Sequence, residues 1–151
     1  MKKFILPSLC AFTLLFSCNN DDDSSNEASI VGTWNYVKYQ TQFSKDNHIE
    51  DEDIANECTK QDGYTFSSDN KYSAIGHDDF GGTCTIDWKE NGTYQISGKT
   101  IRLNNGTDDF SEAEIVSLTD HELILKSEYN EEELDLDGDG KKEFQILILK
   151  R

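Results

Sequence analysis

Basic residues are scarce in this chain of 151 residues. Lys and Arg number 14 against 30 Asp and Glu, which gives a net charge of −16 at pH 7. Such a surface repels phosphate backbones, so binding of nucleic acid through a basic patch is excluded. The sequence also has no Gly-rich phosphate loop and no Gly-x-Ser-x-Gly motif, and its three histidines lack the spacing of zinc ligands. These absences argue against an enzyme, and we expect no cofactor to be required.

Long hydrophobic runs are also missing, apart from one between Phe4 and Phe16 that follows Met1-Lys2-Lys3. This run is shorter than the roughly 20 residues that a membrane-spanning helix needs, and it has the length of a signal-peptide core. It ends in Ser17-Cys18, which resembles the lipobox of bacterial lipoproteins. The resemblance implies a signal peptide over residues 1–17 and acylation of Cys18, which anchors the protein to a membrane. The alternative is a plain secreted protein.

Residues 18–29 contain Asp21-Asp22-Asp23 and Glu27 and show no apolar periodicity, so we expect them to act as a flexible acidic tether. Acidic residues directly behind the lipidated cysteine resemble the surface-export signal of lipoproteins from Bacteroidetes-type bacteria. The expected location is therefore the outer membrane of a Gram-negative bacterium, with the cell surface favoured over the periplasmic face.

Residues 30–151 form one domain with apolar residues at every second position, as in Tyr94/Ile96 and Ile101/Leu103. This period indicates strands with one buried face. The strands are expected at 30–42, 62–68, 71–77, 83–89, 92–97, 100–104, 112–119, 121–129 and 142–150. We interpret Glu90-Asn91-Gly92 as a hairpin turn between two of them. Eight or nine antiparallel strands joined by hairpins predict an all-β, up-and-down barrel that closes on itself, and the alternative is an open β-sandwich.

The connection between the first two strands is long and carries the one helical pattern. Ile54 and Cys58 lie four residues apart within 50–58, so they would face the same side of a short helix. A connection of about 20 residues in a compact domain is typical of a functional loop or a lid. We therefore expect a short helical lid segment.

Two of the four cysteines remain in the folded domain, because Cys10 leaves with the signal peptide and Cys18 carries lipid. An even pair in an oxidising compartment predicts a disulfide between Cys58 and Cys84. It would join the lid to the strand that carries Cys84. A catalytic thiol is the competing interpretation.

The segment Asp135-Leu136-Asp137-Gly138-Asp139-Gly140 matches the first half of a calcium-binding EF-hand loop. Glu143 at relative position 9 offers a further oxygen, but position 12 is Ile146 rather than glutamate. We expect Asp135, Asp137, Asp139 and Glu143 to hold a structural Ca²⁺. The alternative is an acidic turn without an ion.

Gly32-x-Trp34 at the start of the first strand resembles the lipocalin signature, and the wider pattern resembles lipocalin-like lipoproteins of the Bacteroidetes type. The pattern continues with Cys58, Tyr64-x-Phe66, Lys71-Tyr72, Cys84, Gly92-x-Tyr94, Gly98-Lys99-x-Ile101, Ile115-x-x-Leu118-Thr119 and Leu123-x-Leu125. The resemblance implies a lipocalin-like barrel over residues 30–151. It also implies an arginine stacked on Trp34, for which Arg151 and Lys150 are the candidates.

The resulting hypothesis is a monomeric barrel that binds a small apolar or amphipathic ligand in its interior. The predicted inward residues are Trp34, Tyr64, Phe66, Tyr72, Trp88 and Tyr94. The second hypothesis is a protein-interaction, scaffold or inhibitor module whose barrel is filled by side chains. An internal cavity would favour the first hypothesis, and a filled core with an exposed apolar patch would favour the second.

Overall fold

The computed structural model describes residues 28–107, 110–129 and 135–151. The predicted signal peptide, Cys18 and the tether up to residue 27 lie outside these residues. The strands are β1 (Gly32–Gln42), β2 (Ile49–Ile54), β3 (Gly63–Phe66), β4 (Lys71–Phe80), β5 (Thr83–Ser97), β6 (Thr100–Asn104), β7 (Phe110–Leu118), β8 (Glu122–Glu128) and β9 (Phe144–Lys150). A short 3-10 helix, η1, covers Thr59–Gln61. Within the described residues no helix is long and apolar enough to cross a membrane.

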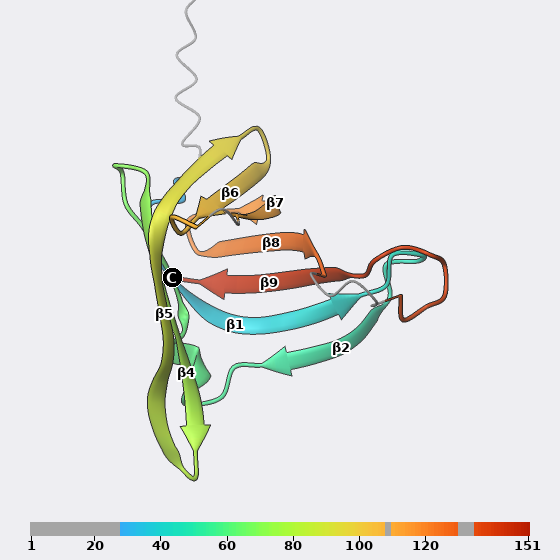
Figure 1. Cartoon of the computed structure of the whole chain (residues 1–151), viewed down its shortest axis with the longest axis horizontal. Helices are drawn as coiled ribbons and strands as arrows, with labels where there is room; N and C mark the ends of the chain where they lie inside the picture. Colours follow the sequence, from blue (N-terminus) through green and yellow to red (C-terminus); the bar gives the residue numbers. More distant parts are fainter. Residues whose placement is uncertain (1–27, 108–109, 130–134) are drawn as a thin grey trace, which may run out of the picture.

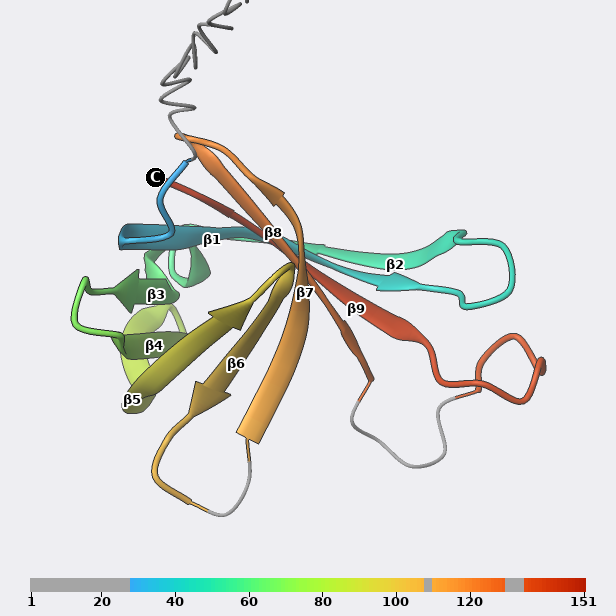
Figure 2. The same ribbon diagram turned by 90° about the horizontal axis from the view of Figure 1, so that it is seen from above.

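The strands form a closed antiparallel barrel (Figures 1 and 2). Each strand from β3 to β8 pairs with the next along the chain, β1 pairs with β3, and β9 returns to pair with β1. Eight strands therefore close the ring, and β2 is an additional strand on the edge of β1. The closed barrel confirms the predicted architecture over the open sandwich.

The predicted helical lid over 50–58 is wrong, because β2 occupies most of that segment. β3 has only four residues, so it pairs with β1 only through Gly32–Asn35. From Lys38 onward, β1 pairs with β2 instead. The Nζ of Lys38 contacts the Glu52 carboxylate at 2.6 Å, and Ile54 is 65% exposed rather than packed beside Cys58. Pairing with a free strand edge thus outweighs the local helical pattern.

The predicted turn at residues 90–92 is also wrong, because β5 runs without interruption for 15 residues. Gly92 lies in the middle of this strand, opposite Tyr72. A Cβ added there would lie 2.1 Å from the Asn104 carbonyl oxygen and 2.7 Å from the Tyr72 ring. Glycine is needed at this position because neighbouring strands approach closely, not because the chain turns.

The core fills one end of the barrel, where the chain enters β1 and leaves β9. Trp34 is fully buried, and its indole N–H donates to the Ile30 carbonyl at 2.7 Å. The guanidinium of Arg151 lies 4.2 Å from the Trp34 ring centroid, so Arg151 rather than Lys150 stacks on it. The other members of the buried cluster are Phe66, Tyr72, Ala74, Tyr94, Ile101, Leu123, Leu125 and Leu149.

Candidate functional site: a half-open cavity in the barrel

The other end of the barrel is hollow. A half-open cavity of about 520 Å³ occupies it, which is within the size range of small-molecule sites. Its apolar wall includes Tyr64, Leu103 and Leu147 from β3, β6 and β9. Ile101, Leu125 and Leu149 belong both to the buried cluster and to the cavity lining, so they lie where the core meets the cavity. These positions alternate along their strands, so the period-2 pattern that builds the barrel also lines the cavity with apolar groups.

The mouth of the cavity combines aromatic rings with carboxylates. Tyr36, Tyr39 and Trp88 line it together with Asp53 and Asp62. The Tyr36 hydroxyl donates to the Asp53 carboxylate at 3.1 Å. Burial raises the pKa of Tyr36, and the hydrogen bond to Asp53 and the charges of Asp53 and Asp62 raise it further. The negative charges of Asp53 and Asp62 therefore both favour the neutral form of the Tyr36 hydroxyl.

Trp88 lies on the open side and is 46% exposed. Its ring lies across the backbone of the neighbouring strand, where a Cβ on Gly76 would come within 2.1 Å of the indole nitrogen. Gly76 therefore makes room for the indole ring. Because Gly76 has no side chain, the Trp88 ring can lie flat against β4 beside the cavity mouth.

The six predicted interior residues divide between the two ends of the barrel. Tyr64 and Trp88 line the cavity. Trp34, Phe66, Tyr72 and Tyr94 belong to the packed core, where the Phe66 and Tyr94 rings meet edge to face with centroids 5.1 Å apart. The barrel is therefore filled at one end and hollow at the other, a division that the strand pattern does not reveal.

Two aromatic residues of the mouth, Tyr36 and Tyr39, are missing from the predicted set. They lie three residues apart, and a register shift between Tyr36 and Lys38 brings both to the cavity. A strict alternation places them on opposite faces, so only the irregularity of β1 explains their shared orientation. In the sequence, this shared orientation is signalled only by a break in the apolar pattern of the first strand.

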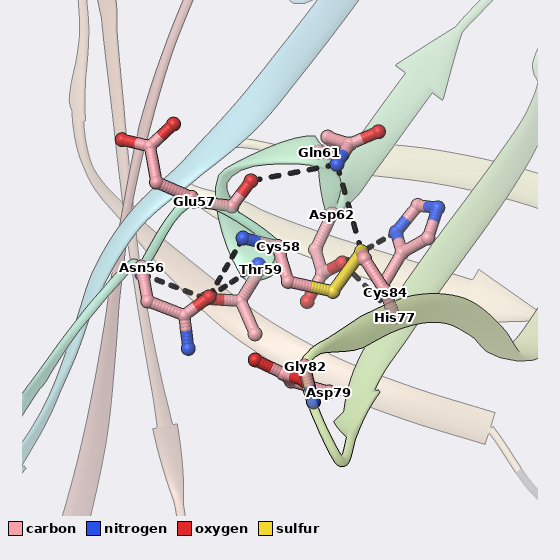
Figure 3. The surroundings of a disulfide bond; sticks show 10 residues. All are labelled: Asn56, Glu57, Cys58, Thr59, Gln61, Asp62, His77, Asp79, Gly82 and Cys84. Atoms are coloured by element: carbon pink, nitrogen blue, oxygen red, sulfur yellow. Dashed lines mark hydrogen bonds and ion pairs between the residues drawn. A yellow bond between two sulfur atoms is a disulfide. The ribbon is translucent and has the colours of Figure 1, made fainter.

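The disulfide between Cys58 and Cys84 is present, with the two Cα atoms 5.4 Å apart. It joins the segment before η1 to the hairpin of β4 and β5 (Figure 3). Beside it, Asp62 accepts a hydrogen bond from the His77 backbone N–H at 2.8 Å, and the His77 ring nitrogen Nδ1 lies 2.8 Å from the same oxygen. These contacts fix one side of the cavity mouth.

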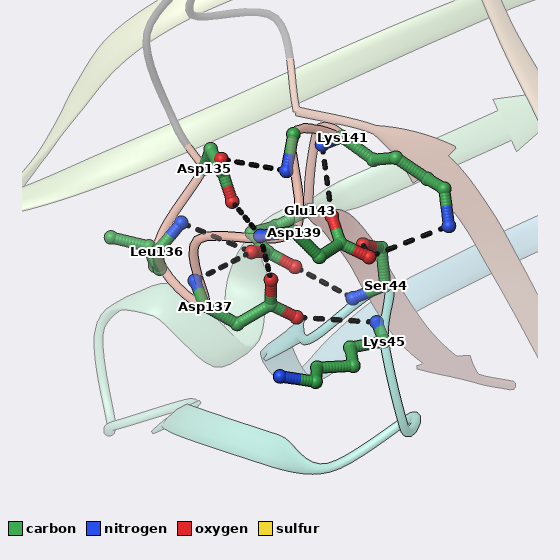
Figure 4. Close-up of polar contacts among 9 residues, drawn as sticks. Ser44, Lys45, Asp135, Leu136, Asp137, Asp139, Lys141 and Glu143 are labelled. Carbon is green, nitrogen blue, oxygen red and sulfur yellow. Dashed lines mark hydrogen bonds and ion pairs between the residues drawn. The ribbon is translucent and has the colours of Figure 1, made fainter.

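The predicted calcium ligands gather in the loop before β9 (Figure 4). Carboxylate oxygens of Asp135, Asp137 and Glu143 lie within 4.8 Å of one another. Asp139 instead accepts a hydrogen bond from the Ser44 hydroxyl at 3.0 Å.

Glu143 is fully buried and accepts backbone N–H groups from Ser44 and Leu136 at 2.7 and 3.0 Å. The carboxylate therefore joins this loop to the connection between β1 and β2. Calcium binding by the loop stays a prediction.

Fold and cavity together define a small antiparallel barrel with one open end, and comparison with known proteins agrees. The sequence pattern of the lipocalin-like domain family matches residues 30–125, and the chain belongs to that family. An uncharacterized protein from Bacteroides eggerthii is similar in structure, with 13% identity, a TM-score of 0.50, and coverage of 82% of this chain and all of that one. This likeness supports the fold.

Two further solved structures are less similar. A lipocalin-like protein from Bacteroides uniformis gives a TM-score of 0.47 at 17% identity, covering 80% of this chain and 96% of that one. A deswapped triple mutant of bovine odorant-binding protein gives 0.41 at 14% identity, covering 80% of this chain and 72% of that one. No functionally curated protein matches the chain at a significant level.

Proposed function

We propose that this protein binds a small apolar or amphipathic ligand in the open half of its barrel and performs no catalysis. The cavity of about 520 Å³ carries the proposal, because side chains do not fill it and its wall is largely apolar. The mouth is half open, so a ligand reaches the wall without unfolding of the barrel. We also propose that the binding unit is a monomer.

The test is native mass spectrometry of the chain from residue 18 with Cys18→Ser, before and after organic extraction. We expect a bound small molecule that extraction removes, and rebinding of amphiphiles from a lipid panel. Ala113→Phe, which adds a ring at the cavity wall, should prevent rebinding. Glu114→Phe adds the same ring at an exposed position of β7 and serves as the control. A protein that arrives empty and accepts no amphiphile contradicts the proposal.

We further propose that Cys18 carries lipid and holds the barrel at the outer membrane of a Gram-negative bacterium, on the cell surface. The lipobox-like Leu15-Phe16-Ser17-Cys18 and the acidic residues behind it support this location. Lipid-labelled full-length protein should fractionate with membranes, and Cys18→Ala should lose both label and membrane association. Protease added to intact cells should remove the domain, whereas protection of the domain in intact cells would indicate the periplasmic face.

The second candidate function is a protein-interaction, scaffold or inhibitor module. A shallow hollow on the outside of β1, β2, β7, β8 and β9 favours it, because its lining includes Ile49, Val116, Ile124, Ile146 and Ile148. An apolar outer surface of this kind is typical of contacts between proteins. Failure of the ligand test together with loss of partner capture in Val116→Asp would support this second function.

A further inference from the structure

The charged residues that line the cavity all have the same sign. Among the described lining residues the charged ones are Asp53, Asp62 and Glu112, and none is Lys, Arg or His. Glu112 pairs with Arg102 at 3.5 Å. That arginine also lies over the Phe110 ring, 3.3 Å from its centroid. The charge of Glu112 is therefore balanced. Asp62 contacts the His77 ring at 2.8 Å, whereas Asp53 contacts the Tyr36 hydroxyl and no basic group among the described residues, so the lining residues at the mouth carry a net negative charge.

These two carboxylates belong to the same part of the mouth. Asp53 accepts the Tyr36 hydroxyl, while the backbone N–H of Tyr36 donates to the Asp62 carbonyl at 2.8 Å. Both carboxylate charges contribute to the raised pKa of Tyr36, after burial as the main cause. On the strand that bears Tyr36, Lys38 is paired with Glu52. Because the charge of Lys38 is balanced by Glu52, Lys38 does not neutralise the carboxylates at the mouth.

Aromatic rings complete this part of the cavity. Tyr36, Tyr39 and the half-exposed Trp88 line it beside the carboxylates. Aromatic faces attract cations, and tryptophan does so most strongly. Aromatic rings beside carboxylates are the combination of groups that favours an organic cation. A carboxylate or phosphate head group would find no positive partner among the lining residues that the structure describes.

We infer that the ligand is a cationic amphiphile, with a protonated amine or quaternary ammonium head between Asp53, Asp62 and the aromatic rings. Its apolar tail lies on the wall formed by Leu103, Leu125 and Leu147. This inference rests on the proposed function and adds the chemical class of the ligand.

The experiment compares three probes that share one tail, namely decyltrimethylammonium, decanol and decyl sulfate. Each is titrated below its micelle concentration, at near-physiological salt, into the chain from residue 18 with Cys18→Ser. Calorimetry gives the affinity, and the emission of Trp88 reports entry into the cavity, since Trp34 is fully buried at the other end. We expect the ammonium probe to bind about tenfold more tightly than decanol, and the sulfate probe to bind most weakly.

Two double variants separate a local site from the overall negative charge. Asp53→Asn with Asp62→Asn should abolish the preference for the ammonium head while decanol still binds. Asp78→Asn with Asp87→Asn removes the same charge from exposed positions outside the cavity lining and should leave the preference intact. Circular dichroism and thermal melting verify that both variants are folded.

Each result has one meaning. Equal or tighter binding of decanol or decyl sulfate by the unsubstituted protein overturns the cationic class but leaves the proposed function standing. An equal loss of preference in both double variants overturns it too, because the attraction would then come from the whole surface. If none of the three probes binds, the proposed function fails together with this inference.

Discussion

Arg151 links the first and last residues of the barrel domain, which meet at the filled end of the barrel. Its side chain donates to the backbone carbonyls of Asp120, Val31 and Ser29 at 2.6, 3.0 and 3.0 Å, and it stacks on Trp34. A planar guanidinium makes all these contacts at once, which a lysine ammonium does not. The residue therefore fixes the entry into β1 against the exit from β9.

Arg151→Ala is expected to lower the free energy of unfolding by about 1–2 kcal/mol, since it removes the cation–π contact and charge-assisted hydrogen bonds. Arg151→Lys should recover only part of this loss. Urea unfolding followed by tryptophan fluorescence measures both. Lys150→Ala, at an exposed neighbouring position, is the control and should change little. Equal effects of the two alanine variants would show that the contacts of Arg151 are not stabilising.

Asp69, in the connection between β3 and β4, makes stability depend on acid pH. Its carboxylate accepts hydrogen bonds from Lys71 at 2.5 Å and from the Ser67 hydroxyl at 2.6 Å. These contacts, with Lys71 first, lower the pKa of Asp69 from 3.8 to about 2. A carboxyl whose pKa is lower in the folded state stabilises the fold above its unfolded pKa. That stabilisation is lost as pH falls through the folded value.

The difference in urea midpoint between the wild type and Asp69→Asn should therefore stay constant from pH 7 down to about 4 and shrink between pH 4 and 2. The contribution is small because the carboxylate is largely exposed to solvent. Asp87→Asn, at an exposed position of β5, is the control. A difference that grows below pH 4 would contradict the assignment.

At the scale of elements, the period-2 pattern predicts most strands because one face of each is buried. The exceptions have a common physical origin in contacts that the local sequence does not contain. β2 forms because β3 is too short to cover β1, and β5 continues through Gly92 because Asn104 and Tyr72 approach it closely. The predicted helix over 50–58 and the predicted turn at 90–92 are both wrong because strand pairing depends on segments far apart in the sequence. A local helix or turn signal carries no information about such pairing.

The disulfide holds the segment before η1 against the β4–β5 hairpin, which is exposed at its tip. Its cysteines are 26 residues apart, and closing a loop of that length stabilises the fold by about 3–4 kcal/mol in the chain-entropy model. Cys58→Ser, Cys84→Ser and the double variant should all lose this amount, because any of them breaks the same bond. Urea unfolding measures the three. Additive losses in the double variant would indicate separate packing roles for the two sulfurs.

At the scale of the whole molecule, the inward positions are predictable from the sequence, but the division between core and cavity is not. Phe66 and Leu103 both follow the strand pattern, yet Phe66 packs in the core while Leu103 lines the cavity. The difference depends on where the strands converge and where they separate, and that is a property of the closed barrel. The negative mouth is likewise hidden in the sequence, because Asp53 and Asp62 are two of 30 acidic residues.

The overall charge of −16 also sets how salt acts on the fold. Screening weakens repulsion among carboxylates, so NaCl should raise the melting temperature of the whole domain. If the loop of Asp135, Asp137 and Glu143 binds calcium, CaCl₂ should raise it further than NaCl or MgCl₂ at equal ionic strength, because calcium accepts flexible all-oxygen sites more readily than magnesium.

Asp135→Asn should remove this additional effect of calcium and preserve the response to NaCl, while Asp87→Asn should preserve both. Differential scanning calorimetry in the three salts separates screening by the ionic atmosphere from binding at the loop. Identical curves in the three salts would show that the loop is an acidic turn. Its carboxylates would then be stabilised by hydrogen bonds within the protein, such as the one that the Gly140 backbone N–H donates to Asp135 at 2.9 Å and the one that the Ser44 hydroxyl donates to Asp139 at 3.0 Å.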